Sequence, residues 1–244
     1  MINHEKNVAD EIGTDDVKLC CSENVCAFKS DESAMRGSTN ELTDFVIENG
    51  RLIKYCGHSQ NVIIPNCVME IGNRAFAFCK DIKSVTIPDG VIGIGDSAFL
   101  YCENLTSISI HSGVTSIGIA AFWRCKNLKS LTIPDSVTSI GKYAFCYCIA
   151  LESVTLSKEI SVIGCGAFAH CESLKSVSVP DGVTSIGEST FLWCESLPSI
   201  TIPGGVTSIG AAAFEACDNI VISAPRDSYA IEYAKENGIK YIET

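Results

Sequence analysis

Apolar residues recur at a fixed interval of 23 residues along most of this chain. Steps of 23 residues from Phe122 reach a phenylalanine each time, at Phe76, Phe99, Phe145, Phe168, Phe191 and Phe214. The same step from Gly118 reaches only glycines, at Gly72, Gly95, Gly141, Gly164, Gly187 and Gly210. A strict period without insertions is typical of a solenoid, in which each repeat forms one coil that stacks on the preceding coil. We therefore expect a stack of coils.

Each repeat predicts two short strands separated by a turn. In the copy that begins at Leu105, residues 105–110 alternate apolar and polar side chains, as a half-buried strand does. Such strands from neighbouring coils would pair in parallel. In most copies a proline follows, often with Asp-Gly or Asp-Ser behind it, and this combination predicts a turn. Residues 114–117 then read as a second short extended segment.

The last part of each repeat predicts a bend and a helical turn. We expect Gly118 and its copies to mark a bend with positive φ, because glycine adopts that conformation without steric cost. Ala121, Phe122 and Cys125 then have the spacing of one α- or 3₁₀-helical turn that faces the core. One coil is therefore expected to contain a strand, a turn, a short strand and a helical turn.

Residues 1–41 lack the repeat and form a polar segment with nine acidic and four basic residues. This composition predicts disorder for much of the segment. Residues 17–28, with the sequence VKLCCSENVCAF, could form a short amphipathic element. Cys20, Cys21 and Cys26 raise the alternative of a metal site, but no fourth ligand stands at a zinc-like spacing. We therefore predict no metal site.

A hairpin is predicted where the repeats begin. Residues 42–55 place apolar residues on both sides of Asn49-Gly50, a dipeptide that favours hairpin turns. A solenoid needs a cover for its first coil, and this hairpin is well placed to supply one. We assign residues 42–222 to the solenoid together with its N-terminal hairpin cap.

Residues 223–244 depart from the repeat and read as a C-terminal helical cap. Residues 229–237 have the pattern of a helix, with Asp227 or Ser228 as its N-cap. Residues 239–242 could add an edge strand. Caps at both ends argue against end-to-end stacking, so we expect a monomer.

Composition narrows the classes of partner. The 244 residues are 46% apolar, which is enough for one elongated core in a single domain. The net charge of −11 argues against nucleic acid and anionic membrane surfaces as partners. No apolar run approaches the ~20 residues that span a bilayer, so we expect no membrane insertion. The N-terminus also lacks the apolar region of a secretory signal. Three explanations are open: the protein stays in the cytoplasm, it leaves by a route that the sequence does not show, or the chain is a fragment.

Most of the cysteines belong to the repeat. Eight of the fourteen fall in one column, at Cys56, Cys79, Cys102, Cys125, Cys148, Cys171, Cys194 and Cys217. Side chains that point the same way from stacked coils lack the facing geometry of a disulfide. We interpret this column as small buried apolar side chains with free thiols, which suits a reducing or anaerobic setting.

The recurring pattern L-x-S-[VIL]-[ST]-[IVL]-P-x-x-V-T-S-I-G-x-x-A-F-x-x-C resembles the BspA-type, or Treponema pallidum-type, leucine-rich repeat family. The resemblance covers the chain from about Phe45 to Ile222. It implies a right-handed leucine-rich-repeat solenoid of about eight coils, with parallel strands and short helical turns. Members of the family are commonly surface-associated proteins of bacteria and some protists that take part in adhesion. The resemblance implies no catalytic residues.

The candidate binding residues stand directly before the column of cysteines. Helical geometry predicts that this position faces outward, and large side chains of interface type occupy it: Phe78, Tyr101, Arg124, Tyr147, His170 and Trp193, with Trp123 as an extension. Such a stripe favours contact with a partner. In the alternative interpretation, the rings lie flat over the coil edges and seal the cysteine column. A second outward surface consists of the serine and threonine side chains that flank the centre of each strand.

The sequence offers no constellation for catalysis. Its four histidines occupy unrelated positions, and there is neither a catalytic triad nor a glycine-rich phosphate loop. We predict a non-enzymatic protein-binding module without a cofactor, acting in adhesion or surface recognition. An intracellular scaffold is the alternative that the missing signal and the free thiols favour. Carbohydrate binding by the aromatic stripe is a further alternative.

Overall fold

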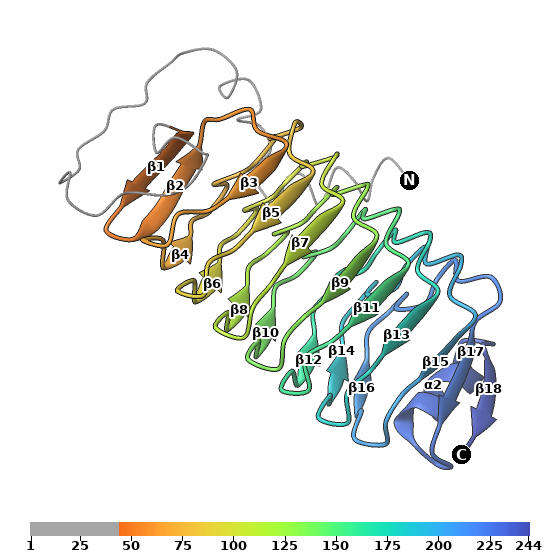
Figure 1. Ribbon diagram of the computed structural model, residues 1–244. Helices are drawn as coiled ribbons and strands as arrows, with labels where there is room; N and C mark the ends of the chain where they lie inside the picture. The colour runs from red at the N-terminus through yellow and green to blue at the C-terminus, as the bar shows by residue number, and fades with distance from the viewer. Residues whose placement is uncertain (1–43) are drawn as a thin grey trace.

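A computed structural model describes residues 44–244 of the chain. It shows one stack of coils, with the hairpin of β1 and β2 at one end and α2 and β18 at the other (Figure 1). About eight coils follow one another at steps of 23 residues, and the predicted solenoid is confirmed. The disorder, the amphipathic element and the cysteine cluster predicted within residues 1–41 lie outside the described residues.

The predicted N-terminal hairpin is present. Strands β1 (Phe45–Glu48) and β2 (Arg51–Tyr55) pair in an antiparallel manner. Asn49 and Gly50 connect them with φ angles of 50° and 77°, the two positive values that a type I′ turn requires. Strand β2 continues into the solenoid because it pairs in parallel with β4.

The first side of the solenoid consists of one strand from each coil. These strands are β3 (Asn61–Ile63), β5 (Ser84–Thr86), β7 (Ser107–Ser109), β9 (Ser130–Thr132), β11 (Ser153–Thr155), β13 (Ser176–Ser178), β15 (Ser199–Thr201) and β17 (Val221–Ala224). Paired strands from β3 to β13 run parallel with a step of 23 residues, for example Ser84 beside Ser107, whereas β15 and β17 pair with a step of 22 residues. The central residue of each three-residue strand is buried, whereas most of its flanking side chains are exposed. The alternation read from the sequence is therefore confirmed.

The second side consists of two-residue strands, as predicted. They are β4 (Glu70–Ile71), β6 (Gly93–Ile94), β8 (Ser116–Ile117), β10 (Ser139–Ile140), β12 (Val162–Ile163), β14 (Ser185–Ile186) and β16 (Ser208–Ile209). Parallel pairing again follows the 23-residue step, as between Ile117 and Ile140. Wherever strands of either series pair, they therefore keep neighbouring coils in one register, although the pairing is interrupted between β7 and β9, β13 and β15, and β10 and β12.

The third side, here called the turn side, comprises the residues from each repeat glycine to the following cysteine of the column. It contains hydrogen-bonded turns instead of the predicted helical turn. Within a coil, the N–H of Cys125 donates to the carbonyl of Phe122 at 3.1 Å. Alternate N–H groups donate to the next coil instead, from Phe122 to Ala144 at 2.7 Å and from Arg124 to Cys146 at 2.9 Å. The backbone of the turn side therefore binds neighbouring coils together as the strands do.

The conformation predicted for the repeat glycine is wrong. Among the described glycines, only Gly50, Gly166 and Gly238 have positive φ, and Gly118 does not. A Cβ atom on Gly118 would instead lie 2.6 Å from the backbone N of Asp96 in the preceding coil. The glycine is required because two coils approach each other closely, and the positive φ values fall elsewhere in the turn side.

A column of stacked phenylalanine rings fills the centre of the core. Consecutive rings have centroids 4.9–5.7 Å apart and planes within 6–11° of each other. The members are Phe76, Phe99, Phe122, Phe145, Phe168, Phe191 and Phe214, all buried. Aromatic pairs of this kind stabilise a fold by ~1 kcal/mol beyond the area that they bury.

The column of cysteines has a structural role beyond filling space. Six of its thiols donate to the carbonyl of a phenylalanine 26 residues earlier, with S···O distances of 3.0–3.3 Å. Burial raises the pKa of Cys125 well above its usual range, and raises that of Cys217 to about 11. The described cysteines are free thiols, as expected.

The C-terminal segment forms the predicted helix and edge strand. Helix α2 (Tyr229–Glu236) buries Ala230, Ile231, Tyr233 and Ala234. Strand β18 (Lys240–Glu243) pairs in parallel with β17. Ser228 is the N-cap residue, although its side chain makes no capping hydrogen bond. Within residues 44–244, the structure has no helix of the length and hydrophobicity that crossing a bilayer requires.

Candidate binding surface

The turn side carries a second apolar cluster that is separate from the main core. Its buried members are Leu100, Ala120, Trp123, Cys146, Ala169 and Leu192. Partly buried aromatic residues pack against them, including Phe78, Tyr101, Tyr147 and Trp193. We use the name aromatic stripe for Phe78, Tyr101, Trp123, Arg124, Tyr147, His170 and Trp193, which are the candidate residues from the sequence. The structure brings all seven together on this side.

Rings of the aromatic stripe contact one another from coil to coil. Phe78 stacks on Tyr101 with centroids 5.0 Å apart and planes at 15°. Tyr147 stacks on His170 at 4.2 Å and 6°, and His170 on Trp193 at 6.0 Å and 8°. Trp123 stands edge-on between two tyrosines, at 5.1 Å from Tyr101 and 6.1 Å from Tyr147. The stripe is therefore a continuous row of rings across six coils.

Arg124 occupies a ring position in this row. Its guanidinium carbon lies 5.3 Å from the ring centroid of Tyr101 and 4.8 Å from that of Tyr147. It also lies 5.2 Å from the ring of Trp123. A planar guanidinium can stack on aromatic faces and keep its charge, so Arg124 continues the row and adds a cation to it.

The backbone under the stripe is left-handed. The residue before each described column cysteine from Cys79 onward has φ between 57° and 64°, at Phe78, Tyr101, Arg124, Tyr147, His170, Trp193 and Ala216. This conformation costs a non-glycine residue ~1 kcal/mol. In return, the N–H of Tyr147 donates to the carbonyl of Ala169 in the next coil at 2.9 Å. The left-handed conformation thus places the side chain in the stripe and directs the backbone N–H to the next coil.

Burial of the stripe differs from the sequence-based expectation. Trp123 is 1% exposed and His170 is 5% exposed, so neither projects freely. Phe78, Tyr101, Arg124, Tyr147 and Trp193 are partly exposed. The row lies outside the main core, as expected, but it is a packed surface instead of a set of projecting rings.

Charged residues border the stripe where each coil passes beyond the cysteine column. Glu103 lies 2.8 Å from the Nζ of Lys126 and 4.0 Å from that of Lys80. The hydrogen bond from Lys126 lowers the pKa of Glu103, and nearby positive charges, including Arg124, lower it further. Near Arg124, the border of the stripe therefore combines the carboxylate of Glu103 with the cations of Lys80 and Lys126.

The strand face offers a different kind of surface. Rows of serine and threonine side chains, such as Ser107, Ser130 and Ser153, lie exposed along the solenoid. Neighbouring strands place these side chains in register. The hydroxyl of Ser84 donates to Asn61 at 2.7 Å. This face therefore presents hydroxyl groups, with charged side chains such as Glu152 and Lys175 beside the strands.

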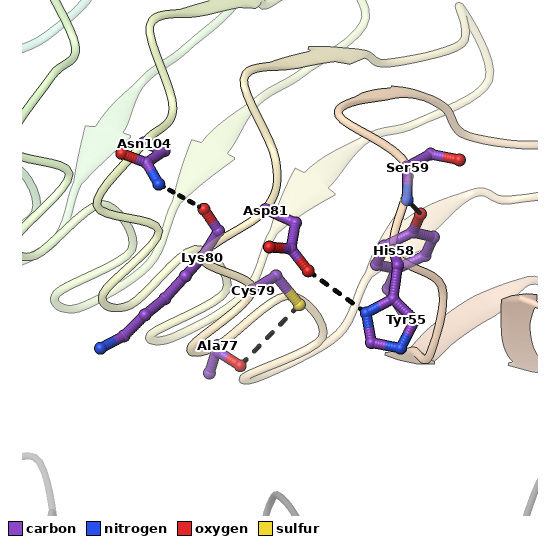
Figure 2. Close-up of polar contacts among 8 residues, drawn as sticks. All are labelled: Tyr55, His58, Ser59, Ala77, Cys79, Lys80, Asp81 and Asn104. Carbon is purple, nitrogen blue, oxygen red and sulfur yellow. Dashed lines mark hydrogen bonds and ion pairs between the residues drawn. The ribbon is translucent and has the colours of Figure 1, made fainter.

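A histidine and a carboxylate meet at the N-terminal coils without forming a catalytic arrangement. The Nδ1 of His58 lies 3.2 Å from Asp81, and both side chains are largely exposed. Figure 2 shows that the thiol of Cys79 points toward the carbonyl of Ala77, at 4.0 Å, and not toward His58. Across residues 44–244, no group of three or more His, Cys, Asp or Glu side chains could hold a metal ion.

The chain matches the BspA type leucine rich repeat region over residues 47–171 and 115–234, in six copies. The matched residues cover most of the chain. The chain belongs to the BspA-type leucine-rich repeat family. Among curated proteins, none matches it.

Solved structures of bacterial repeat proteins are similar to this BspA-type chain. A leucine rich cell surface protein from Faecalibacterium prausnitzii is 35% identical with a TM-score of 0.68, and the match covers 76% of this chain and 53% of that protein. The Treponema pallidum leucine rich repeat protein is 28% identical with a TM-score of 0.67, covering 79% and 89%. A leucine-rich repeat protein from Bacteroides ovatus is 30% identical with a TM-score of 0.59, covering 75% and 51%. The chain thus spans about half the length of the first and third of these proteins.

Family membership indicates the class of molecule. The leucine-rich repeat family suggests a protein-binding repeat module, and proteins of this kind are generally non-enzymatic. The aromatic stripe was recognisable from the sequence as a column, because all its members except Trp123 precede the same repeated cysteine. The stacking and the place of Arg124 between two rings were not recognisable, since they depend on the left-handed backbone of the turn side.

Proposed function

We propose that this chain is a surface-recognition module that binds a protein partner through the aromatic stripe. Support for a surface role comes from the Faecalibacterium prausnitzii relative, which is described as a cell surface protein. Support for the site comes from the residue types, since aromatic residues and arginine are enriched at protein interfaces and among their energetic centres.

The single observation that carries this proposal is the row of stacked rings with Arg124 inside it. The rings of such a row are already ordered, so the stripe loses little side-chain entropy when it binds a partner. The partly exposed members, Tyr101, Tyr147 and Trp193, add edges and polar atoms along the stripe. A partner segment with apolar side chains and a carboxylate fits this surface best, because the carboxylate can reach the cation of Arg124.

Ring orientation favours a protein partner over a glycan. Sugar rings bind aromatic side chains mainly by lying on an open ring face. Here the faces of Phe78 and Tyr101 are turned toward each other, as are those of Tyr147 and His170. The row therefore offers ring edges to a partner, and carbohydrate binding is the weaker candidate.

A display experiment tests the site. A library of displayed protein fragments is selected on the wild-type chain, and the binders are measured against the variant Tyr101→Ala/Tyr147→Ala/Trp193→Ala. We expect affinity to fall by 10-fold or more, since interface aromatics each contribute ~1–2 kcal/mol. Ser107→Ala/Ser130→Ala/Ser153→Ala on the strand face is the matched control, and its affinity should stay unchanged. Binders that lose affinity only for the serine variant would place the site on the strand face.

A separate experiment tests the surface role against the intracellular scaffold. Intact cells of the source organism are treated with protease, and released peptides from residues 45–222 are compared with a cytoplasmic marker. Release of these peptides while the marker stays protected supports surface recognition. Peptides that appear only after lysis favour the scaffold, in which case the stripe should be tested against cytoplasmic proteins.

A further inference from the structure

Two neighbouring coils depart from the repeat at exposed positions on the second side. In the later coils, the residue before each two-residue strand carries a hydroxyl group: Thr115, Thr138, Ser161, Thr184 and Thr207. Met69 and Ile92 occupy this position before β4 and β6, where they are 54% and 60% exposed. The N–H of Ile92 donates to the carbonyl of Met69 at 2.9 Å, so the two residues are direct neighbours. The later coils thus serve as a reference within the same molecule.

An apolar residue at this position gives up a hydrogen bond. The hydroxyl of Thr115 donates to the carbonyl of Ile92 at 2.9 Å, and three later threonines make the same bond to the preceding coil at 3.2–3.4 Å. Met69 and Ile92 have no hydroxyl to make it, and both place apolar surface in water. A local departure that costs stability in an otherwise regular sequence points to a functional contact.

A shallow groove of about 310 Å³ lies beside these residues. Its lining comes from β4, β6, β8 and β10 and the residues that follow them, and these strands lie side by side (Figure 1). Three steps between coils extend over ~14 Å at ~4.8 Å for each step. An extended peptide of ~5 residues covers that distance. The groove therefore suits a linear segment better than a folded domain.

Gly93 leaves the floor of the groove without a side chain. The equivalent position carries a side chain in the other described coils, at Glu70, Ser116, Ser139, Val162, Ser185 and Ser208. A Cβ atom on Gly93 would meet only the Oγ of Ser116 within 4 Å, at 3.3 Å. The approach of neighbouring coils therefore does not require glycine here, in contrast to Gly118. The missing side chain instead leaves space beside Ile119, which lines the groove and is 42% exposed.

The charge of the groove favours a basic partner. Among the described residues that line it, Glu70 and Asp96 are acidic and none is basic. Glu70 lies 3.2 Å from Arg51, which offsets its charge. The Oδ1 of Asp96 accepts the N–H of Ile119 at 2.7 Å, so its second oxygen can accept from a partner. A second copy of this chain, with its net charge of −11, complements such a groove poorly, whereas a lysine or arginine side chain complements it well.

We propose that this groove binds an extended peptide segment of a partner protein that carries a lysine or arginine next to apolar side chains. The basic side chain pairs with Asp96, while an apolar side chain fills the space over Gly93 and contacts Ile92 and Ile119. Binding removes from water the apolar surface that the departures from the repeat expose. The site lies on the second side, so it is separate from the aromatic stripe and does not depend on the function proposed for the stripe.

A parallel peptide selection tests the site. A displayed library of short random peptides is selected on the full wild-type chain and on Met69→Thr/Ile92→Thr, here called the groove variant. This variant restores the residue type of the later coils, so it should fold at least as stably. We expect peptides with a basic residue next to apolar residues to be enriched ~10-fold or more on the wild type relative to the groove variant. Equal enrichment on both, or no enrichment on the wild type, would overturn the proposal. The matched control Val162→Ser replaces an exposed apolar residue of the same side outside the groove, and it should select the same peptides as the wild type.

The charge of Asp96 is tested separately. Asp96→Asn removes the charge and keeps the bond to the next coil, since Asn73 accepts the N–H of Asp96 in the same way at 2.9 Å. We expect the affinity of the selected peptides to fall ~5-fold and to depend less on salt. An unchanged affinity would overturn the assignment of a basic partner. Tyr101→Ala/Tyr147→Ala/Trp193→Ala should bind these peptides as the wild type does. Peptides that lose affinity for this variant and keep it for the groove variant would contradict the groove and support the stripe.

Discussion

At the scale of single residues, the distance between coils decides which side chains the repeat accepts. Gly141 lies so close to the preceding coil that a Cβ atom would stand 2.5 Å from the backbone of Gly118 and of Ile119. Gly90, outside this column, has its nearest atom at 3.5 Å from such a Cβ. A larger side chain therefore fits at Gly90 but not at Gly141.

Gly141→Ala should lower the free energy of unfolding by ~2–3 kcal/mol, because backbone atoms of two coils must move apart. Gly90→Ala should change it by less than ~0.5 kcal/mol. Urea denaturation of both variants measures the difference. Similar losses in the two variants would show that the approach of the coils is not what selects glycine.

The buried thiols predict a dependence of stability on pH. Burial raises the pKa of the Cys148 thiol in the folded chain well above its ordinary value, so the unfolded chain releases its proton first. The stabilising contribution is complete below pH 9 and is lost as the pH rises through the folded pKa. Each such thiol should reduce the free energy of unfolding by ~1.4 kcal/mol for each pH unit above 9.

Comparison with Cys148→Ala isolates this effect from other groups that titrate at high pH. We expect the stability of the wild type to fall more steeply between neutral pH and about pH 10 than that of the variant. Chemical denaturation under reducing conditions gives both slopes. Parallel slopes would mean that the thiol is not held neutral by the fold.

At the scale of elements, the strands follow from the sequence and the turn side does not. Residues 107–109 alternate in a way that only a half-buried strand explains, and their pairing follows from the period alone. The spacing of Ala121, Phe122 and Cys125 is compatible with a helix as well as with turns. Hydrogen bonds to the next coil favour the turns over a helix. These bonds join two repeats, so the sequence pattern of one repeat does not predict them. For the same reason the stacking of the candidate rings was not predictable.

The turn side also predicts a stabilising substitution. Ala212 has φ of 53°, and the equivalent position in another coil is Gly166 with φ of 59°. Ala212→Gly should therefore raise the free energy of unfolding by up to ~1 kcal/mol, since it removes the clash of a Cβ atom in the left-handed region. The neighbour Ala211 lacks positive φ, so Ala211→Gly should be neutral or destabilising. Thermal melts of the two variants compare them, and a loss in both would contradict the assignment of strain.

At the scale of the whole molecule, each coil contacts only its neighbours, so the repeat number is adjustable. The sequence predicted this architecture because the period leaves one way to align the coils, with Phe122 above Phe99 and below Phe145. The partner and the exposed area of the stripe were not predictable from it. The exposed area depends on how the rings pack from coil to coil, which the stacking of the stripe decides.

Deleting residues 126–148 removes one full period and joins Cys125 to Ile149. We expect this variant to fold into a shorter solenoid with a cooperative transition, because every remaining coil keeps its register. Deleting residues 126–137 removes about half a coil and should abolish the cooperative transition, since strands would face turns. Circular dichroism during heating distinguishes the two. Loss of structure in both variants would show that the coils are not interchangeable.

The hydrogen bonds on all three sides run from coil to coil, along the long axis of the molecule. Tension applied between the two ends therefore loads the few bonds of one coil at a time, as in peeling, and does not load all of them together. A chain held at both ends under flow should lengthen in equal increments. Each increment equals the extended length of one 23-residue repeat minus the distance between neighbouring coils in the folded solenoid. Force spectroscopy should record these increments as a series of similar steps, and a single large step would contradict it. Built in this way, the protein can absorb mechanical work without losing its remaining coils.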